Sequence, residues 1–157
     1  MVEMKKIIFI TCIAILSCSP GHKTEIVNAI GQDEYARLMT SSIDLFDQSS
    51  EGFRQYSDNY ALVSLLIPEY IEVNQLSDEE SRNLHWHMGQ IHAFNGYEQE
   101  AIAEMKQSYA GGSITWKCYV DGSIAFLQQD NQMNIEILEK FVKYFDKSYM
   151  EAYSAEY

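Results

Sequence analysis

The sequence is poor in the residues that make tight turns and in the residues that bind nucleic acids. Two prolines and eight glycines occur in 157 residues, which is few for a sheet protein and favours long helices. Lysine and arginine number 11 against 23 aspartates and glutamates, giving a formal net charge of −12. A nucleic-acid backbone needs a basic footprint that displaces its counterions. The composition therefore favours an all-α protein that does not bind nucleic acid.

Long hydrophobic runs are also missing from the sequence. The most apolar stretch, residues 7–16, is short, and at about 1.5 Å per residue such a helix cannot cross roughly 30 Å of hydrocarbon. The hydrophobic content is 46%, which is too high for a disordered chain and suits one globular domain. We expect one domain, over residues 33–157, with no membrane-spanning helix.

Residues 1–17 are typical of an export signal. Lys5 and Lys6 precede the apolar stretch, and a small residue and Cys18 follow it. The alternative, ordinary cleavage after Ser19, is disfavoured by the proline that follows. Residues 18–32 contain Pro20, Gly21 and Gly31 with only a short apolar cluster, and we expect them to form a tether.

The segment Ile15-Leu16-Ser17-Cys18 resembles a bacterial lipobox. In that motif the cysteine is acylated and becomes the mature N-terminus. The resemblance implies that Cys18 is the lipidation site and that the protein contacts the membrane only through this anchor. It also implies a location in the bacterial cell envelope, either facing the periplasm or on the cell surface.

Cysteine is too scarce for a disulfide framework. Of the three cysteines, Cys12 lies in the signal and Cys18 is the expected lipid carrier, so only Cys118 is left as a thiol. Cys118 and Asp121 could be imagined as part of a thiol catalyst, but the net charge of the chain is acidic and Cys118 does not lie at a predicted helix N-terminus. We expect Cys118 to act as a small buried hydrophobe.

Apolar residues that recur at spacings of three and four predict six helices. The expected ranges are 33–48, 58–73, 77–95, 97–109, 115–128 and a sixth from residue 130, which is followed by an aromatic stripe at Tyr149, Tyr153 and Tyr157. Ser77 and Glu80 have the capping-box spacing at the start of the third helix. Pro68 should kink or divide the second helix because proline lacks an N–H.

The last four predicted helices form two hairpins with a common spacing. Gly89 recurs at Gly122, 33 residues later, and the turn at Gly96 recurs 34 residues later at Asp130. These residues, with Ala101 in the second helix of the first hairpin, resemble the tetratricopeptide repeat, whose period is about 34 residues. The second repeat departs from that pattern at Asp121, and Asn134 or Ile135 stands where the alanine is expected; no proline closes either repeat.

Two further phrases, residues 84–90 and 119–127, resemble a group of small exported bacterial proteins that have such repeats and no assigned activity. Together the resemblances imply a right-handed stack of helical hairpins, with the first two helices forming a third, irregular hairpin. They imply nothing about activity.

Three histidines lie on the third predicted helix and raise the question of a metal site. His85 and His92 share a face but are about 10 Å apart along the axis, and His87 points the other way, so one zinc ion cannot reach two of them. In the register of the tetratricopeptide repeat, His85 and His92 stand where packing aromatics usually lie. The resemblance therefore implies that both imidazoles are partly buried and hydrogen-bonded between helices. A pH-sensitive packing role is the alternative.

The chain also lacks the short motifs of common catalytic sites. No His-Glu-x-x-His, Gly-x-Ser-x-Gly or Cys-x-x-Cys occurs, and the Gly111-Gly112-Ser113 stretch lacks the lysine of a phosphate loop. We therefore expect no catalytic residue, no metal and no cofactor.

The tetratricopeptide resemblance implies that the first helix of each repeat lines a groove. Its register assigns seven groove residues: Asn83, Trp86, Gln90, Phe94, Trp116, Tyr119 and Ser123, with Phe126 or Leu127 as possible additions. Aromatic rings interleaved with amides and hydroxyls can bind a peptide, although the same aromatics could instead be core. The sequence thus favours a non-enzymatic module that binds a protein or peptide. The alternative is an acidic inhibitor or immunity-type lipoprotein that neutralises a basic toxin or hydrolase.

Overall fold

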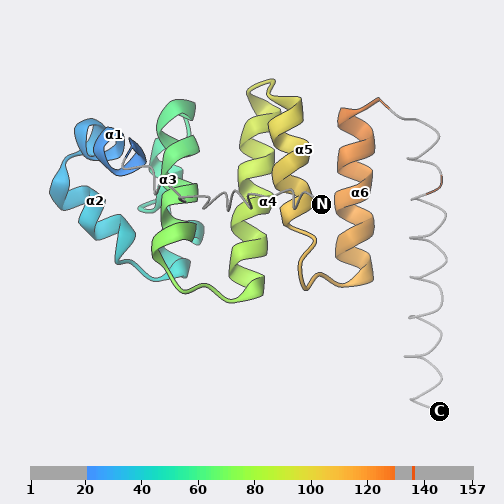
Figure 1. Cartoon of the computed structure of the whole chain (residues 1–157), viewed down its shortest axis with the longest axis horizontal. Helices are drawn as coiled ribbons and strands as arrows, with labels where there is room; N and C mark the ends of the chain where they lie inside the picture. Colours follow the sequence, from blue (N-terminus) through green and yellow to red (C-terminus); the bar gives the residue numbers. More distant parts are fainter. Residues whose placement is uncertain (1–20, 130–135, 137–157) are drawn as a thin grey trace, which may run out of the picture.

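The computed structural model describes residues 21–129 and residue 136, and every regular element in that part of the chain is helical. Figure 1 shows the helices in a row, with α1 at one end and α6 at the other. They are α1 (Gly21–Ile30), α2 (Gln32–Met39), a π-helical turn η1 (Asp44–Gln48), a 3₁₀ turn η2 (Phe53–Tyr56), α3 (Tyr60–Val73), α4 (Asp78–Phe94), α5 (Glu98–Gln107) and α6 (Ile114–Leu127). The predicted all-α class is confirmed for these residues.

Several predictions concern residues outside this part of the chain: the export signal, Cys18, the sixth helix and the tyrosine stripe after residue 148. Among the described residues, no helix is both long enough and apolar enough to cross a membrane.

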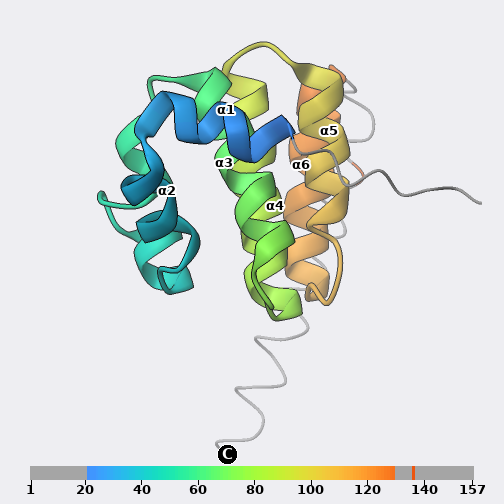
Figure 2. The ribbon, with the colours of Figure 1, turned by 60° about the vertical axis from the view of Figure 1, so that its left-hand side comes forward.

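Residues 21–30, which we expected to belong to a tether, form helix α1 instead. Its Ile26 is fully buried, and Val27 and Ile30 pack against the same core. The three apolar residues are spaced at one, three and four positions, so they share one helix face. Figure 2 shows α1 lying across α3, which supplies the apolar surface that this face buries.

The helix predicted over 33–48 is interrupted after Met39. The Thr40 hydroxyl donates to the carbonyl of Ala36 and the Ser41 hydroxyl to that of Leu38, both at 2.7 Å. Hydroxyl side chains compete in this way with the backbone N–H groups that would continue a helix. The chain then turns into η1, which places Phe46 in a stacked pair with Tyr70 of α3.

Helix α3 begins after Asn59, whose side chain accepts a hydrogen bond from the backbone N–H of Leu62. It runs through Pro68 as one helix, so the proline does not divide it. The buried Glu69 carboxylate accepts a 2.6 Å hydrogen bond from the Tyr35 hydroxyl of α2. Burial and the bond to Glu69 raise the pKa of Tyr35 to about 12, so this hydroxyl stays protonated and keeps α2 joined to α3.

Helices α4 and α5 form a close hairpin. The predicted capping box is confirmed: the Ser77 hydroxyl accepts from the Glu80 N–H, and the Glu80 carboxylate accepts from the Ser77 N–H. The turn between the helices has Gly96 at φ +79°, a backbone conformation that favours glycine. Within the hairpin, a Cβ at Gly89 would lie 2.7 Å from Cγ of Met105. The absence of a side chain at Gly89 therefore lets the two helices approach.

The apolar side chains form two cores that meet at α4. The larger core joins α1, α2, η1, η2 and α3 to Leu84 and Met88 of α4. The smaller core joins Trp86 of α4 to α5 and α6, with Val120 and Ile124 at its centre. Helix α4 thus contributes opposite faces to the two cores.

Candidate functional site

Three aromatic side chains meet where α4 lies beside α6. The Trp86 ring is 5.3 Å from that of Trp116 and 5.0 Å from that of Tyr119, measured between centroids. Trp86 is only 7% exposed. It belongs to the smaller core, and the expectation that it lines an open groove is corrected, because the two rings of α6 cover the indole.

Residues at and before the start of α6, together with Arg82 of α4, hold the Trp116 side chain in place. The Ser113 side chain caps the helix by accepting a hydrogen bond from the Trp116 N–H. The indole Nε1 donates to the carbonyl of Ser108 at 2.8 Å, and a Cβ at Gly112 would collide with the ring. The guanidinium of Arg82 in α4 lies 5.7 Å from the ring centroid, within cation–π range. The half-buried Trp116 is therefore a fixed edge of the cluster.

The most exposed aromatic rings of the described residues lie on α4 and α6. Phe94 is 89% exposed at the end of α4, while Tyr119 and Phe126 of α6 are 55% and 76% exposed. Tyr119 and Phe126 are seven residues apart, so they lie on one side of α6 about two turns from each other. We call Tyr119 and Phe126 of α6 the aromatic face.

The predicted polar residues of the groove are not fully exposed. Asn83 and Gln90 of α4 and Ser123 of α6 are half-buried. The Ser123 hydroxyl donates to the backbone carbonyl of Tyr119, so its hydrogen bond stays within α6. Of the seven predicted groove residues, two keep strongly exposed rings, four are half-buried and one is core. Phe126, which the sequence suggested only as a possible addition, is among the most exposed large hydrophobic side chains of the described residues.

The histidines of α4 join it to three different elements. His85 Nδ1 lies 2.7 Å from Oε2 of Glu104 on α5, and His92 Nδ1 shares a 2.9 Å hydrogen bond with the Tyr60 hydroxyl of α3. His85 is half-buried and His92 is 8% exposed. The prediction that these two imidazoles are hydrogen-bonded between helices is confirmed. Burial lowers the pKa of His92, an effect that Glu104 and Glu100 oppose, so the buried ring is neutral at pH 7.

His87 points away from the other two histidines, as predicted. Its Nδ1 lies 2.7 Å from Oδ1 of the buried Asp47 in η1, which is ion-pair distance without the geometry of a hydrogen bond. The side chains of Arg54 and Gln48 also contact this carboxylate. The described residues contain no group of three or more His, Cys, Asp or Glu side chains that could hold a metal ion.

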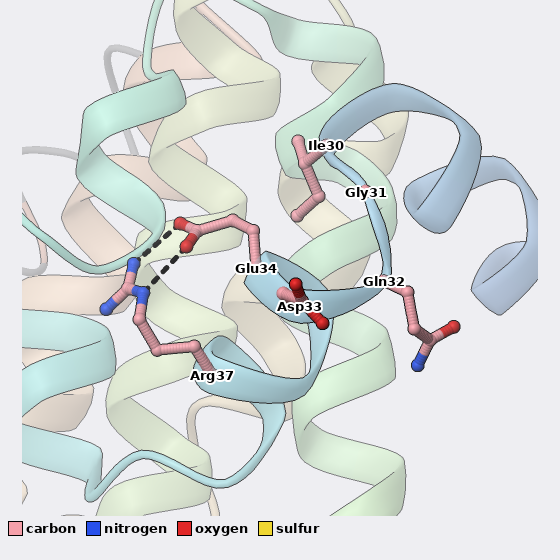
Figure 3. Close-up of a pocket in the computed structure, with 6 residues that line it drawn as sticks. All are labelled: Ile30, Gly31, Gln32, Asp33, Glu34 and Arg37. Carbon is pink, nitrogen blue, oxygen red and sulfur yellow. Dashed lines mark hydrogen bonds and ion pairs between the residues drawn. The ribbon is translucent and has the colours of Figure 1, made fainter.

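A shallow hollow that the sequence did not predict lies at the junction of α1 and α2 (Figure 3). Its volume is about 480 Å³, and its lining consists of Ile30, Gly31, Gln32, Asp33, Glu34 and Arg37. Arg37 binds the Glu34 carboxylate with two hydrogen bonds and donates a third to the carbonyl of Glu51. Arg37 is the one guanidinium in the lining of the hollow, and these intramolecular hydrogen bonds occupy it.

The network around Glu34 also explains its acidity. Hydrogen bonds from Arg37, and more weakly from Tyr56 and Gln55, lower the pKa of Glu34 to about 2 against the effect of burial. The carboxylate is thus ionised at pH 7 and fixes η2 to α2. The hollow has the features of a structural joint more than those of a ligand site.

Comparison with known proteins found no matching family model, no matching curated protein and no matching solved structure.

Proposed function

We propose that this chain is a membrane-tethered, non-enzymatic module of the bacterial envelope that binds a protein or peptide segment on its aromatic face. The observation that carries the proposal is the exposure of Tyr119 and Phe126 on one side of α6. Large apolar rings gain much buried area from a partner at low entropic cost. A rigid base favours such binding, and Tyr119 rests on the buried indole of Trp86.

The proposal includes a tetratricopeptide-like arrangement of α4, α5 and α6. Two contacts support it. Gly89 stands at the close approach of α4 and α5, and Trp86 packs on Tyr119, which lies 33 residues later, close to the period of that repeat. The proposed anchor at Cys18 is supported by the lipobox resemblance of residues 15–18.

An acidic inhibitor or immunity-type lipoprotein is the second candidate, and one feature of the sequence favours it. No lysine or arginine occurs between Arg82 and Lys106, while Glu98 and Glu100 are exposed on α5. A surface of this kind attracts basic proteins, and salt weakens the attraction. The two candidates therefore differ in the surface used and in the response to salt.

Capture from an envelope extract tests the proposal directly. The full-length protein, its Tyr119→Ala/Phe126→Ala variant and a Val73→Ala control are compared at low and high salt. Val73 is 51% exposed but lies on α3, outside the aromatic face. We expect the double variant to lose roughly tenfold or more in affinity for the captured partner, because exposed aromatic anchors commonly dominate binding energy.

The control should bind like the wild type, and circular dichroism should show unchanged helicity in all three proteins. Binding that survives the double substitution but is abolished by salt or by Glu98→Lys/Glu100→Lys would refute the aromatic face and favour the inhibitor.

A further inference from the structure

The chain between the proposed lipid anchor and the first packed helix is very short. Helix α1 begins at Gly21, three residues after Cys18. At about 3.6 Å per extended residue, these steps span at most about 11 Å. This limit follows from covalent geometry and holds for any conformation of the intervening residues.

Helix α1 is a fixed part of the domain. Ile26 is fully buried in the larger core, and Val27 and Ile30 pack against that core. Lys23 lies over the ring of Tyr35 in α2, 5.4 Å from its centroid. Moving α1 away from the domain would expose these contacts, so the helix cannot serve as a spacer.

We propose that the anchor has no tether and that it holds the α1 end of the domain against the lipid headgroups. This inference rests on the proposed function, because it requires the acyl chain on Cys18. The headgroup layer on each side of a bilayer is roughly 5–8 Å thick, so a reach of about 11 Å leaves the first turn of α1 at its outer edge. The side chains that meet this layer are those of His22, Lys23 and Glu25, all of which are exposed.

The same arrangement separates the anchor from the helix that carries the exposed rings of α6. Figure 1 shows α1 at one end of the row of helices and α6, which carries Tyr119 and Phe126, at the other. The anchor precedes the first turn of α1, so we expect the headgroup layer to lie closer to α1 than to α6.

Fluorescence quenching in vesicles tests this placement. The full-length acylated protein, with Cys118 replaced by Ser, receives one fluorophore either at Glu25→Cys in α1 or at Thr115→Cys in α6, both exposed positions. The vesicles contain phosphatidylcholine with a nitroxide on its headgroup. We expect quenching at position 25 to exceed that at position 115 by about twofold or more, because the nitroxide lies within the headgroup layer.

Inserting about ten Gly and Ser residues between Pro20 and Gly21 provides the matched control, since such a linker reaches about 18 Å on average. It should reduce quenching at position 25 while the protein still sediments with the vesicles.

Equal quenching at the two positions in protein that sediments with the vesicles would overturn the inference and leave the anchor intact. Failure to sediment, with no difference between the wild type and Cys18→Ser, would refute the anchor itself and the inference with it.

Discussion

Replacing Trp86 with alanine is the substitution whose effect on folding differs most between a core residue and a groove residue. The indole is 7% exposed and contacts the rings of Trp116 and Tyr119. A buried tryptophan removes about 150–250 Å² from water, which corresponds to about 4–6 kcal/mol at 25 cal/mol per Å². Measured losses for Phe or Trp to Ala in cores are about 3–5 kcal/mol. We expect Trp86→Ala to lower the free energy of unfolding by about 3–5 kcal/mol.

Urea unfolding followed by circular dichroism measures this loss, and two variants calibrate it. Tyr119→Ala removes a ring that is 55% exposed and should cost about 1 kcal/mol, because less than half of the ring leaves water on folding. Trp86→Phe keeps an aromatic ring in the core and should fall between the two alanine variants. A Trp86→Ala protein within about 0.5 kcal/mol of the wild type, the range of ordinary surface substitutions, would refute the placement of this side chain in the core.

Three further substitutions and conditions test the joints of the fold. Gly89→Ala should lower the melting temperature, with a cost of about 1–3 kcal/mol from overpacking against Met105, whereas a neutral result would contradict the close approach of α4 and α5. Ser77→Ala should cost about 1 kcal/mol in urea unfolding by removing the helix cap, and Ser77→Asp should restore most of it. Burial lowers the pKa of His92 below its usual 6.5, so the unfolded chain binds a proton that the folded chain does not. Stability should then fall as the pH drops below about 6.5, by at most about 1.4 kcal/mol per pH unit. His92→Gln should flatten that slope in a pH series of thermal melts, and an unchanged slope would exclude His92 as its source.

The sequence correctly predicted the features that depend on residues within one helical turn of each other. The capping box at Ser77 and the stop at Gly96 depend on residues within one turn, and both occur where the sequence placed them. The inter-helix hydrogen bonds of His85 and His92 were expected from the tetratricopeptide register, which puts both at packing positions of α4.

The predictions that differ from the structure depended on contacts between distant segments. Three apolar residues in α1 are too few to predict a helix, and only the surface of α3 makes their burial favourable. Trp86 was assigned to a groove or a core from the same pattern, and α6 decides between them. The hollow beside Arg37 needs residues from α1 and α2 in one place, which no local motif encodes.

Because α4 gives Leu84 and Met88 to one core and Trp86 to the other, it acts as a common spine for both halves of the described chain. If either half opened alone, the apolar face of α4 that packs against it would be exposed to water. The free-energy cost of that exposure disfavours opening one half while the other stays folded. The amide protons in the middle of α4 should accordingly be among the slowest in the protein to exchange with solvent. A partner bound at the α6 end would, through this spine, slow the opening of the α1 end as well.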